Sequence, residues 1–224
     1  MGGDYAPKAV VDGVLLAREW VTSEVELVLF GDVEQLEKEF KAKGEKVANY
    51  EIVHCSEVIT MNDHPMSGIT KKPNSSISVG FQHLASGKID GFASAGNTGA
   101  MMAGTMTFIK TVPELVRPAI AAYIPVNETQ FNLVLDAGLN SDCKPEVLVQ
   151  YGVLGSLYSQ YVLGVDNPRV ALLNIGAEAE KGNLLAKTTH ELMASSQDFN
   201  FVGNIEGNEL FSNKRADVVV CDGF

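Results

Sequence analysis

The chain has 224 residues, 46% of them hydrophobic and 20% charged, so it can bury a substantial core and is not disordered. Its formal net charge of −11 is spread along the sequence, which argues against a general nucleic-acid binder and against electrostatic anchoring to anionic lipid. The apolar runs are too short to span a bilayer, and the N-terminus lacks the basic and apolar regions of a signal peptide.

Apolar β-branched runs alternate with longer helical patterns, which is typical of a mostly parallel sheet covered by helices on both faces. We expect helices over residues 7–21, 33–43, 76–86, 98–110, 145–163 and 183–194. We expect strands over residues 25–30, 50–54, 90–95, 119–124, 131–135, 169–175, 199–202 and 216–221. Residues 61–74 contain Gly, Pro, Asn and two lysines with little periodicity, and they form the longest predicted loop.

We predict a single α/β domain over residues 1–224, because no linker, repeat or low-complexity tract marks a boundary. Met1–Asp4 is typical of a turn that follows a strand, and Val218–Phe224 is typical of a strand that runs into a glycine turn. We therefore expect the chain to be a fragment that lacks its first strand and its C-terminal part.

The segment Ser94–Ala100, with the sequence SAGNTGA, joins a predicted buried strand to a helix. Glycines let the backbone approach a ligand closely, and a helix N-terminus offers free N–H groups to an anion. Gly96, Thr98, Gly99 and the side chain of Asn97 are therefore candidates to bind phosphate. A tight strand-to-helix turn without a ligand explains the same residues about equally well.

A second candidate anion site precedes the next helix upstream. Lys71 and Lys72 supply two cations, and Ser75 and Ser76 supply hydroxyl groups at a helix cap. Taken alone, these residues are better explained as a solvated basic loop with an ordinary N-cap.

The segment Asp136–Pro145 follows an apolar strand, at the edge where open α/β sheets bind ligands. Asp136 and Asp142 could orient a base or bind a metal, but the segment lacks His partners, so metal binding is the minority interpretation. Cys143 has no visible His or acid partner, and a buried inert thiol is preferred to a nucleophile.

A third loop of this kind is Asn174–Asn183, in which Lys181 is flanked by acids. That pattern fits a surface charge cluster, but its place after a strand and between glycines favours a function. The chain has no dinucleotide or Walker fingerprint, and its histidines and three cysteines (Cys55, Cys143 and Cys221) lack metal-ligand spacing. The loops together predict a site for an anionic small molecule, with no cofactor and no metal.

At the level of whole motifs, the chain resembles the bacterial phosphate acyltransferases known as PlsX. Met1–Pro7 is similar to the opening MGGD-x-x-P signature of that family, and Ser94–Ala100 is similar to its SAGNTGA motif. Four further segments follow in the family's order and are similar to its RPAI, D-x-GAN-x-DCKPE, NIG-x-E-x-x-KGN and ADVVVCDGF elements: Arg117–Ile120, Asp136–Glu146, Asn174–Asn183 and Ala216–Phe224.

The resemblance implies a three-layer α/β/α Rossmann-like fold akin to phosphotransacetylase and to the isocitrate and isopropylmalate dehydrogenases. It implies a homodimer that converts acyl carrier protein thioester and inorganic phosphate into acyl phosphate and free carrier protein. The product would feed a membrane glycerol-3-phosphate acyltransferase in phospholipid synthesis. The enzyme would be cytoplasmic and would touch the membrane peripherally, through a C-terminal part beyond Phe224; no nucleic acid is implied as a partner.

Carried onto this sequence, the catalytic candidates are Asn97, Asn140 and Lys181, as donors to phosphate and to the oxyanion of the tetrahedral intermediate. The candidate substrate-binding residues are Gly96, Thr98, Gly99, Lys71, Lys72, Ser75, Ser76, Arg117, Asp136 and Asn183. Two alternatives stay open: a phosphotransacetylase-like enzyme that uses acyl-coenzyme A, and a carrier-binding module without catalysis.

Overall fold

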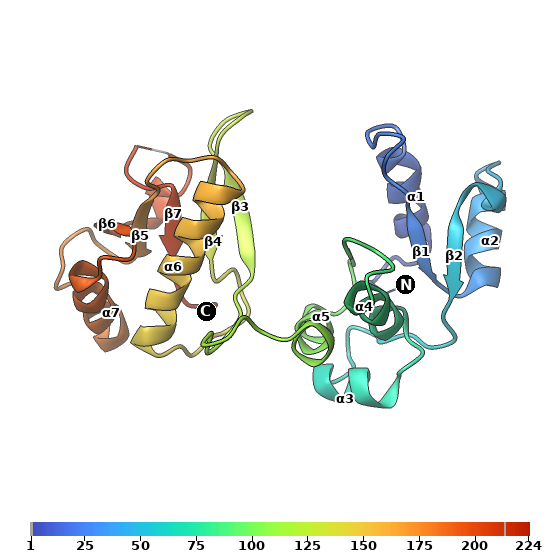
Figure 1. Ribbon diagram of the computed structural model, residues 1–224, viewed down its shortest axis with the longest axis horizontal. Coiled ribbons are helices and arrows are strands. Elements are labelled where there is room, and N and C mark those ends of the chain that lie inside the picture. Colours follow the sequence, from blue (N-terminus) through green and yellow to red (C-terminus); the bar gives the residue numbers. More distant parts are fainter. Residues whose placement is uncertain (1, 213) are drawn as a thin grey trace. The chain divides into compact units, whose positions relative to one another are not determined.

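The computed structural model describes residues 2–212 and 214–224, and the chain divides into two compact units, Met1–Thr111 and Val112–Phe224 (Figure 1). Each unit has hydrophobic clusters of its own. The sequence analysis found no boundary here, because residues 105–118 contain no Gly or Ser that would mark a linker. The grouping of both units into one functional domain stays a prediction.

The N-terminal unit contains a two-stranded parallel sheet of β1 (Val28–Gly31) and β2 (Glu51–His54), in which Val28 lies opposite Glu51. Its helical elements are α1 (Lys8–Ala17), α2 (Val33–Ala42), η1 (Val47–Asn49), α3 (Pro65–Lys71), α4 (Ser76–Ala85), α5 (Thr98–Gly104) and the π-helical turn η2 (Thr105–Ile109).

Helix α2 shows how the sequence builds this unit. It begins after Asp32, whose side chain accepts a hydrogen bond from the Gln35 N–H and so caps the first turn. Leu36 and Phe40 lie one turn apart on the apolar face and are fully buried, and they form a cluster with Val11 of α1. Burial of each such side chain stabilises the fold by about 1.5–3 kcal/mol.

Two predictions for the N-terminal unit are wrong. The predicted loop over residues 61–74 contains the helix α3, which starts with Pro65 at its first position. Gly68 of this helix packs against Ile59, and Gly99 of α5 lies so close to Pro65 that a Cβ would come within 2.5 Å of the proline Cγ. The predicted strand over residues 90–95 forms no strand ladder within the described residues.

The C-terminal unit contains a five-stranded sheet in the order β3-β4-β7-β5-β6. Only β3 runs antiparallel to its neighbour β4; the other neighbours are parallel, as the apolar β-branched runs predicted. The elements of the unit are β3 (Ala121–Pro125), β4 (Phe131–Leu135), α6 (Pro145–Tyr161), β5 (Arg169–Leu173), α7 (Leu184–Ser195), β6 (Asn200–Ile205), η3 (Gly207–Glu209) and β7 (Val218–Val220).

Helix α6 packs directly on the centre of this sheet. At Gly155, a Cβ would lie 2.4 Å from Cγ1 of Val218, so only glycine permits this close approach of helix and strand. The cluster beneath the helix includes Leu133, Tyr151 and Val170, all fully buried. This dense packing fixes the carboxyl end of β4, from which the Asp136–Pro145 segment emerges.

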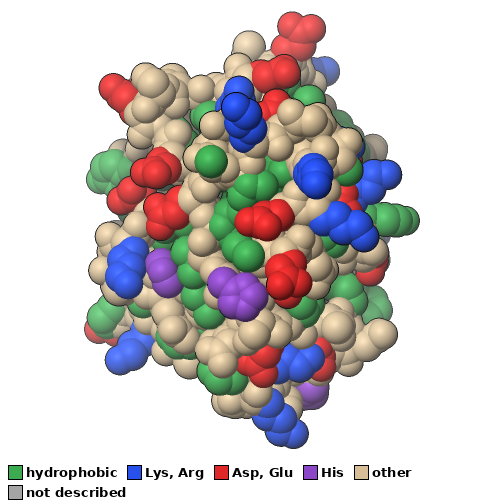
Figure 2. All heavy atoms as spheres, turned by 90° about the vertical axis from the view of Figure 1, so that its right-hand side faces the viewer, with side chains coloured by type: hydrophobic (Ala, Val, Ile, Leu, Met, Phe, Trp, Pro, Cys, Tyr) green, Lys and Arg blue, Asp and Glu red, His purple; other side chains and the backbone are tan. Residues whose placement is uncertain are grey.

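None of the helices over residues 2–212 and 214–224 has the length and apolar character needed to cross a membrane. On the face shown in Figure 2, acidic and basic side chains are interspersed around small hydrophobic areas.

Candidate functional site

The side chain of Asn97 is buried and fully engaged. Its Oδ1 accepts a hydrogen bond from the Ala100 N–H and caps α5. Its Nδ2 donates to the carbonyl oxygens of Thr60 and Asp63, both at 3.1 Å, and to that of Met61 at 3.4 Å. With only 6% of its surface exposed, Asn97 holds the loop of residues 60–63, and the anion contact predicted for its amide would have to replace these bonds.

The glycines of the same turn also serve packing. Gly96 is buried and lies against Gly2, where a Cβ on Gly2 would come within 3.3 Å of the Gly96 Cα. Gly99 brings α5 against Pro65, as described above. Thr98, by contrast, is exposed at the first position of α5. In this turn, then, Thr98 is the predicted residue whose side chain is open to solvent.

Lys72 also holds the loop that Asn97 contacts, through Val58 and Asp63. Its Nζ donates to the Val58 carbonyl at 2.9 Å and pairs with Oδ2 of Asp63 at 2.6 Å. That hydrogen bond, together with the Thr60 N–H and hydroxyl, lowers the pKa of the Asp63 carboxyl to about 2. The positive charge of Lys72 is therefore neutralised by a partly exposed ion pair, whereas Lys71 is exposed and has no such partner among the described residues.

The two predicted serines form the cap of α4. Ser75 is fully buried, and its Oγ accepts from the Ser78 N–H at 3.3 Å and bonds the Ser78 hydroxyl at 3.0 Å. Ser76 is also buried, with 5% of its surface exposed. The sequence analysis preferred an ordinary N-cap for these residues taken alone, and the structure places them in one.

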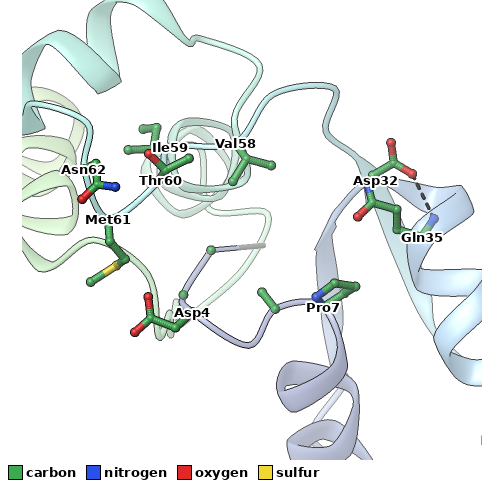
Figure 3. A pocket seen from close by; sticks show the side chains of 12 residues that line it. Asp4, Pro7, Asp32, Gln35, Val58, Ile59, Thr60, Met61 and Asn62 are labelled. Atoms are coloured by element: carbon green, nitrogen blue, oxygen red, sulfur yellow. Dashed lines mark hydrogen bonds between the residues drawn. The ribbon is translucent and has the colours of Figure 1, made fainter.

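The loop held by Asn97 and Lys72 forms one wall of a pocket with a volume of about 270 Å³ (Figure 3). The opposite wall is the turn that opens the chain, and the first turn of α2 adds two polar side chains. The lining residues are Gly2, Gly3, Asp4, Ala6, Pro7, Asp32, Gln35 and residues 58–62. The pocket lies beyond the carboxyl ends of β1 and β2, where α/β sheets bind ligands.

In the C-terminal unit, Asp136 and Asn140 form a buried hydrogen-bond network. Oδ2 of Asp136 accepts from both the backbone N–H and Nδ2 of Asn140, at 2.7 and 2.8 Å, and Oδ1 accepts from the Ile120 N–H. Asn140 Nδ2 also donates to the Pro118 carbonyl and to the hydroxyl of Tyr151. Both predicted site residues therefore tie the segment after β4 to the chain before β3 and to α6.

Tyr151 was missed by the sequence analysis, because a tyrosine within a helix gives no sign that its hydroxyl meets a loop. Burial is the first cause that raises its pKa above the ordinary value for tyrosine. Burial likewise raises the pKa of the Cys143 thiol, which donates to the Asn140 carbonyl. A protonated, buried thiol is a poor nucleophile, which supports the preferred interpretation of Cys143.

Arg117 lies at the rim of this network. Its Nη1 donates to the Asp142 carbonyl at 3.0 Å, and the side chain is exposed. The guanidinium therefore keeps donors available next to the Asp136–Asn140 segment, in a position to meet an anionic ligand.

The loop Asn174–Asn183 presents Lys181 at the surface. Asn174 Nδ2 donates to the Lys181 carbonyl at 3.1 Å, and Asn183 Oδ1 caps α7 through the Ala186 N–H. Lys181 is exposed and makes no ion pair in the part of the chain that the structure describes. Its ammonium group is the type of donor that phosphate or a developing oxyanion requires.

Asn204 of β6 supports this loop and was also missed from the sequence. It is fully buried; its Nδ2 donates to the Glu178 carbonyl at 2.8 Å, and its Oδ1 lies 2.9 Å from Nδ1 of His190. The sequence carries no sign of this pairing, because it joins a strand, a helix and a loop.

The predicted residues fall into two groups, one in each compact unit. Lys71, Lys72, Ser75, Ser76 and residues 96–99 lie in the N-terminal unit, and Arg117, Asp136, Asn140, Lys181 and Asn183 lie in the C-terminal unit. Over residues 2–212 and 214–224, no cluster of three or more His, Cys, Asp or Glu side chains is placed to hold a metal ion.

Comparison with known proteins gives a consistent result. A family model described as "Fatty acid synthesis protein" matches residues 1–224. A protein of Thermoanaerobacterium thermosaccharolyticum named phosphate acyltransferase is 44% identical over 224 residues, and one of Bacillus subtilis with the same name is 41% identical over 224 residues. Each match covers 100% of this chain but only 65% and 66% of those relatives, so the chain spans slightly less than two thirds of their length.

Two solved structures share the fold at low identity. The EutD phosphotransacetylase from Staphylococcus aureus has a TM-score of 0.62 and 15% identity, covering 94% of this chain and 74% of its own. A branched-chain phosphotransacylase from Enterococcus faecalis V583 has a TM-score of 0.62 and 16% identity, covering 97% and 76%. These likenesses confirm the predicted phosphotransacetylase-like three-layer α/β/α fold.

Proposed function

Since the chain belongs to the fatty acid synthesis protein family, we propose that it is a phosphate acyltransferase, which moves an acyl group from acyl carrier protein to inorganic phosphate. The observation that carries this proposal is the match of all 224 residues to proteins named phosphate acyltransferase at 41–44% identity. The exposed cations Lys181 and Arg117 support it, because the second substrate is an anion.

In the proposed reaction, a phosphate oxygen attacks the carbonyl carbon of the acyl thioester. The carbonyl becomes an oxyanion, a carbon–oxygen bond to phosphate forms, and the carbon–sulfur bond then breaks to release the carrier thiolate, which takes up a proton. Phosphate is itself the nucleophile, so the protein has to hold the two substrates together and stabilise the oxyanion. Lys181 is our candidate for the stabilising charge.

The Asp136–Asn140 network and Asn97 have a different part in this proposal. Their amide and carboxylate groups are engaged with backbone groups, so each keeps the loop of its own unit in one conformation. Asn140 and Asn97 are then positioning residues, each within its own unit, and Lys181 and Arg117 of the C-terminal unit supply the contact with phosphate.

The partners in the proposal follow from the reaction. Acyl carrier protein delivers the acyl group, and a membrane glycerol-3-phosphate acyltransferase consumes the acyl phosphate for phospholipid synthesis. We propose that the enzyme is a homodimer and that it works in the cytoplasm with peripheral contact to the membrane.

The test is to incubate the protein with inorganic phosphate and either palmitoyl carrier protein or acetyl-coenzyme A, and to trap acyl phosphate with hydroxylamine. We expect hydroxamate from palmitoyl carrier protein, at a rate that EDTA does not lower. A faster reaction with acetyl-coenzyme A would support a phosphotransacetylase instead. Binding of the carrier protein without any hydroxamate would support a carrier-binding module.

A further inference from the structure

The pocket of the N-terminal unit has a wall that is unusually well fixed for a loop. Asn97 donates to the carbonyls of Thr60, Met61 and Asp63, and Lys72 donates to that of Val58. The side chain of Asp63 accepts hydrogen bonds from the backbone N–H and the hydroxyl of Thr60. Hydrogen bonds to four of its carbonyl groups keep the loop in one conformation, as the wall of a binding pocket requires.

The charged residues that line the pocket favour a neutral ligand over phosphate. Asp4 and Asp32 both line it, and Figure 3 shows their carboxylates on opposite sides of the space. Among the residues that the structure describes, none that lines the pocket is Lys, Arg or His. An anion would meet two like charges on this lining, whereas the N–H and O–H groups of a neutral ligand would find acceptors.

The rest of the lining is apolar or neutral. Val58 and Met61 remain 42% and 47% exposed, so their side chains have surface left to cover, and Pro7 faces them across the pocket. Thr60 and Asn62 add a hydroxyl and an amide. A ligand that fits this lining is uncharged, with short alkyl groups between hydrogen-bonding amides.

We propose that this pocket binds the pantetheine arm on which the acyl donor carries its thioester. The arm is a chain with two amides, a hydroxyl and a dimethyl carbon, and it is uncharged between its sulfur and its distal phosphate. The inference rests on the proposed acyl transfer and adds to it a place for the arm of the donor in the N-terminal unit. Acyl carrier protein and acyl-coenzyme A share this arm, so both would use the pocket.

The direct test uses the chain with 13C-labelled methionine methyl groups and D-pantetheine, which lacks the distal phosphate. Met61 lines the pocket, and Met66 of α3 is a matched reference outside it, because the two are 47% and 50% exposed. We expect the Met61 methyl signal to shift in a saturable way and the Met66 signal to stay in place. Inorganic phosphate should leave both unchanged. The absence of a Met61 shift at about 10 mM pantetheine, ten times a millimolar Kd, would overturn the proposal.

A second measurement blocks the pocket. Met61→Trp should fill it and raise the KM for palmitoyl carrier protein and for palmitoyl-coenzyme A at least tenfold, with the KM for phosphate unchanged. Met66→Trp should change neither. A rise for the carrier protein alone would mean that the substitution disturbs a protein–protein contact and would count against the pocket.

The two proposals fail in different ways. If the unmodified protein forms no acyl phosphate from either donor, the proposed function is wrong, and the methionine signals still show whether pantetheine binds. If acyl phosphate forms and the KM values of Met61→Trp are normal, the pocket proposal alone is wrong.

Discussion

Two loops, one in each unit, are held by the same kind of interaction, a hydrogen bond from a buried asparagine. They are residues 58–63 in the N-terminal unit and residues 174–183 in the C-terminal unit. In each, a buried asparagine from elsewhere in the unit donates from Nδ2 to loop carbonyls: Asn97 in the first and Asn204 in the second. Each asparagine has its Oδ1 engaged as well, with the Ala100 N–H and with His190 respectively. A side-chain amide suits this task, because it donates and accepts at once.

What differs between the loops is the charge that they leave exposed. In the first, Lys72 is paired with Asp63, and the nearby pocket is lined by the carboxylates of Asp4 and Asp32. In the second, Lys181 stands exposed on a loop fixed through its own carbonyl. We propose that the same backbone support serves two chemistries, a wall for a neutral ligand and a cation for an anion.

Lys181→Ala tests the cationic side of this comparison and should have the largest effect. Loss of one preorganised donor to a transition state costs about 2.7–4 kcal/mol, or a fall in turnover on the order of a hundredfold to a thousandfold. Melting temperature should hardly change, because the side chain is exposed. Acyl phosphate production and melting are measured on the same preparation.

Lys187→Ala is the matched control for that substitution, since Lys187 is exposed on α7, six residues further along the chain. It should retain normal turnover. If Lys181→Ala keeps more than about a third of wild-type turnover, far above the loss expected for an oxyanion donor, Lys181 is a surface charge and the contrast between the loops disappears.

Asn97→Ala tests the hydrogen bonds from a buried asparagine that both loops share, and it should lower stability as well as turnover. The substitution removes a helix cap, worth about 1 kcal/mol, and leaves loop carbonyls without their donor, at about 1–3 kcal/mol. Asn183→Ala removes only a cap, that of α7. Urea denaturation should therefore show a larger loss for Asn97→Ala than for Asn183→Ala, by about 1–3 kcal/mol. Equal losses would mean that Asn97 is no more than a cap.

The fold was largely predictable because its signals are local. The β-branched runs of β4, β5 and β7 indicated buried parallel strands, and Pro145 marked the start of α6. The strand predicted over residues 90–95 was wrong because an apolar run shows only that a segment can pair. The residues of the segment do not indicate whether another strand lies beside it.

The candidate site was predictable in its segments but less so in the roles of its residues. The sequence pointed to Asn97 and Asn140 as ligand groups, because short polar side chains after strands often bind ligands, and to Lys72 as a cation ahead of a helix. In the structure their side chains hold backbone groups 14 to 37 residues away, a kind of contact that no local spacing reveals, and their contact with a ligand stays a prediction. Asp63 and Asn204 were missed for the same reason. Asp63 pairs with Lys72, and Asn204 donates a hydrogen bond to the Glu178 carbonyl, and neither contact follows from local spacing.

The pairing of Lys72 with Asp63 gives the smallest and most local prediction. The pKa of the Asp63 carboxyl is lowered to about 2, first by the hydrogen bond from Lys72 and then by those from Thr60, so Lys72→Met should raise it part of the way towards 3.8. Because the folded pKa lies below the unfolded one, the pair stabilises the loop fully above about pH 4, and this contribution is lost as the pH falls through about 2. Carboxyl 13C shifts recorded during acid titration would measure the pKa of Asp63 in the unmodified protein and in Lys72→Met.

Lys71→Met, at the exposed neighbouring lysine, should leave the Asp63 titration unchanged. An Asp63 carboxyl that titrates near 3.8 in the unmodified protein would mean that the ion pair with Lys72 does not form and that this lysine does not hold the loop through Asp63.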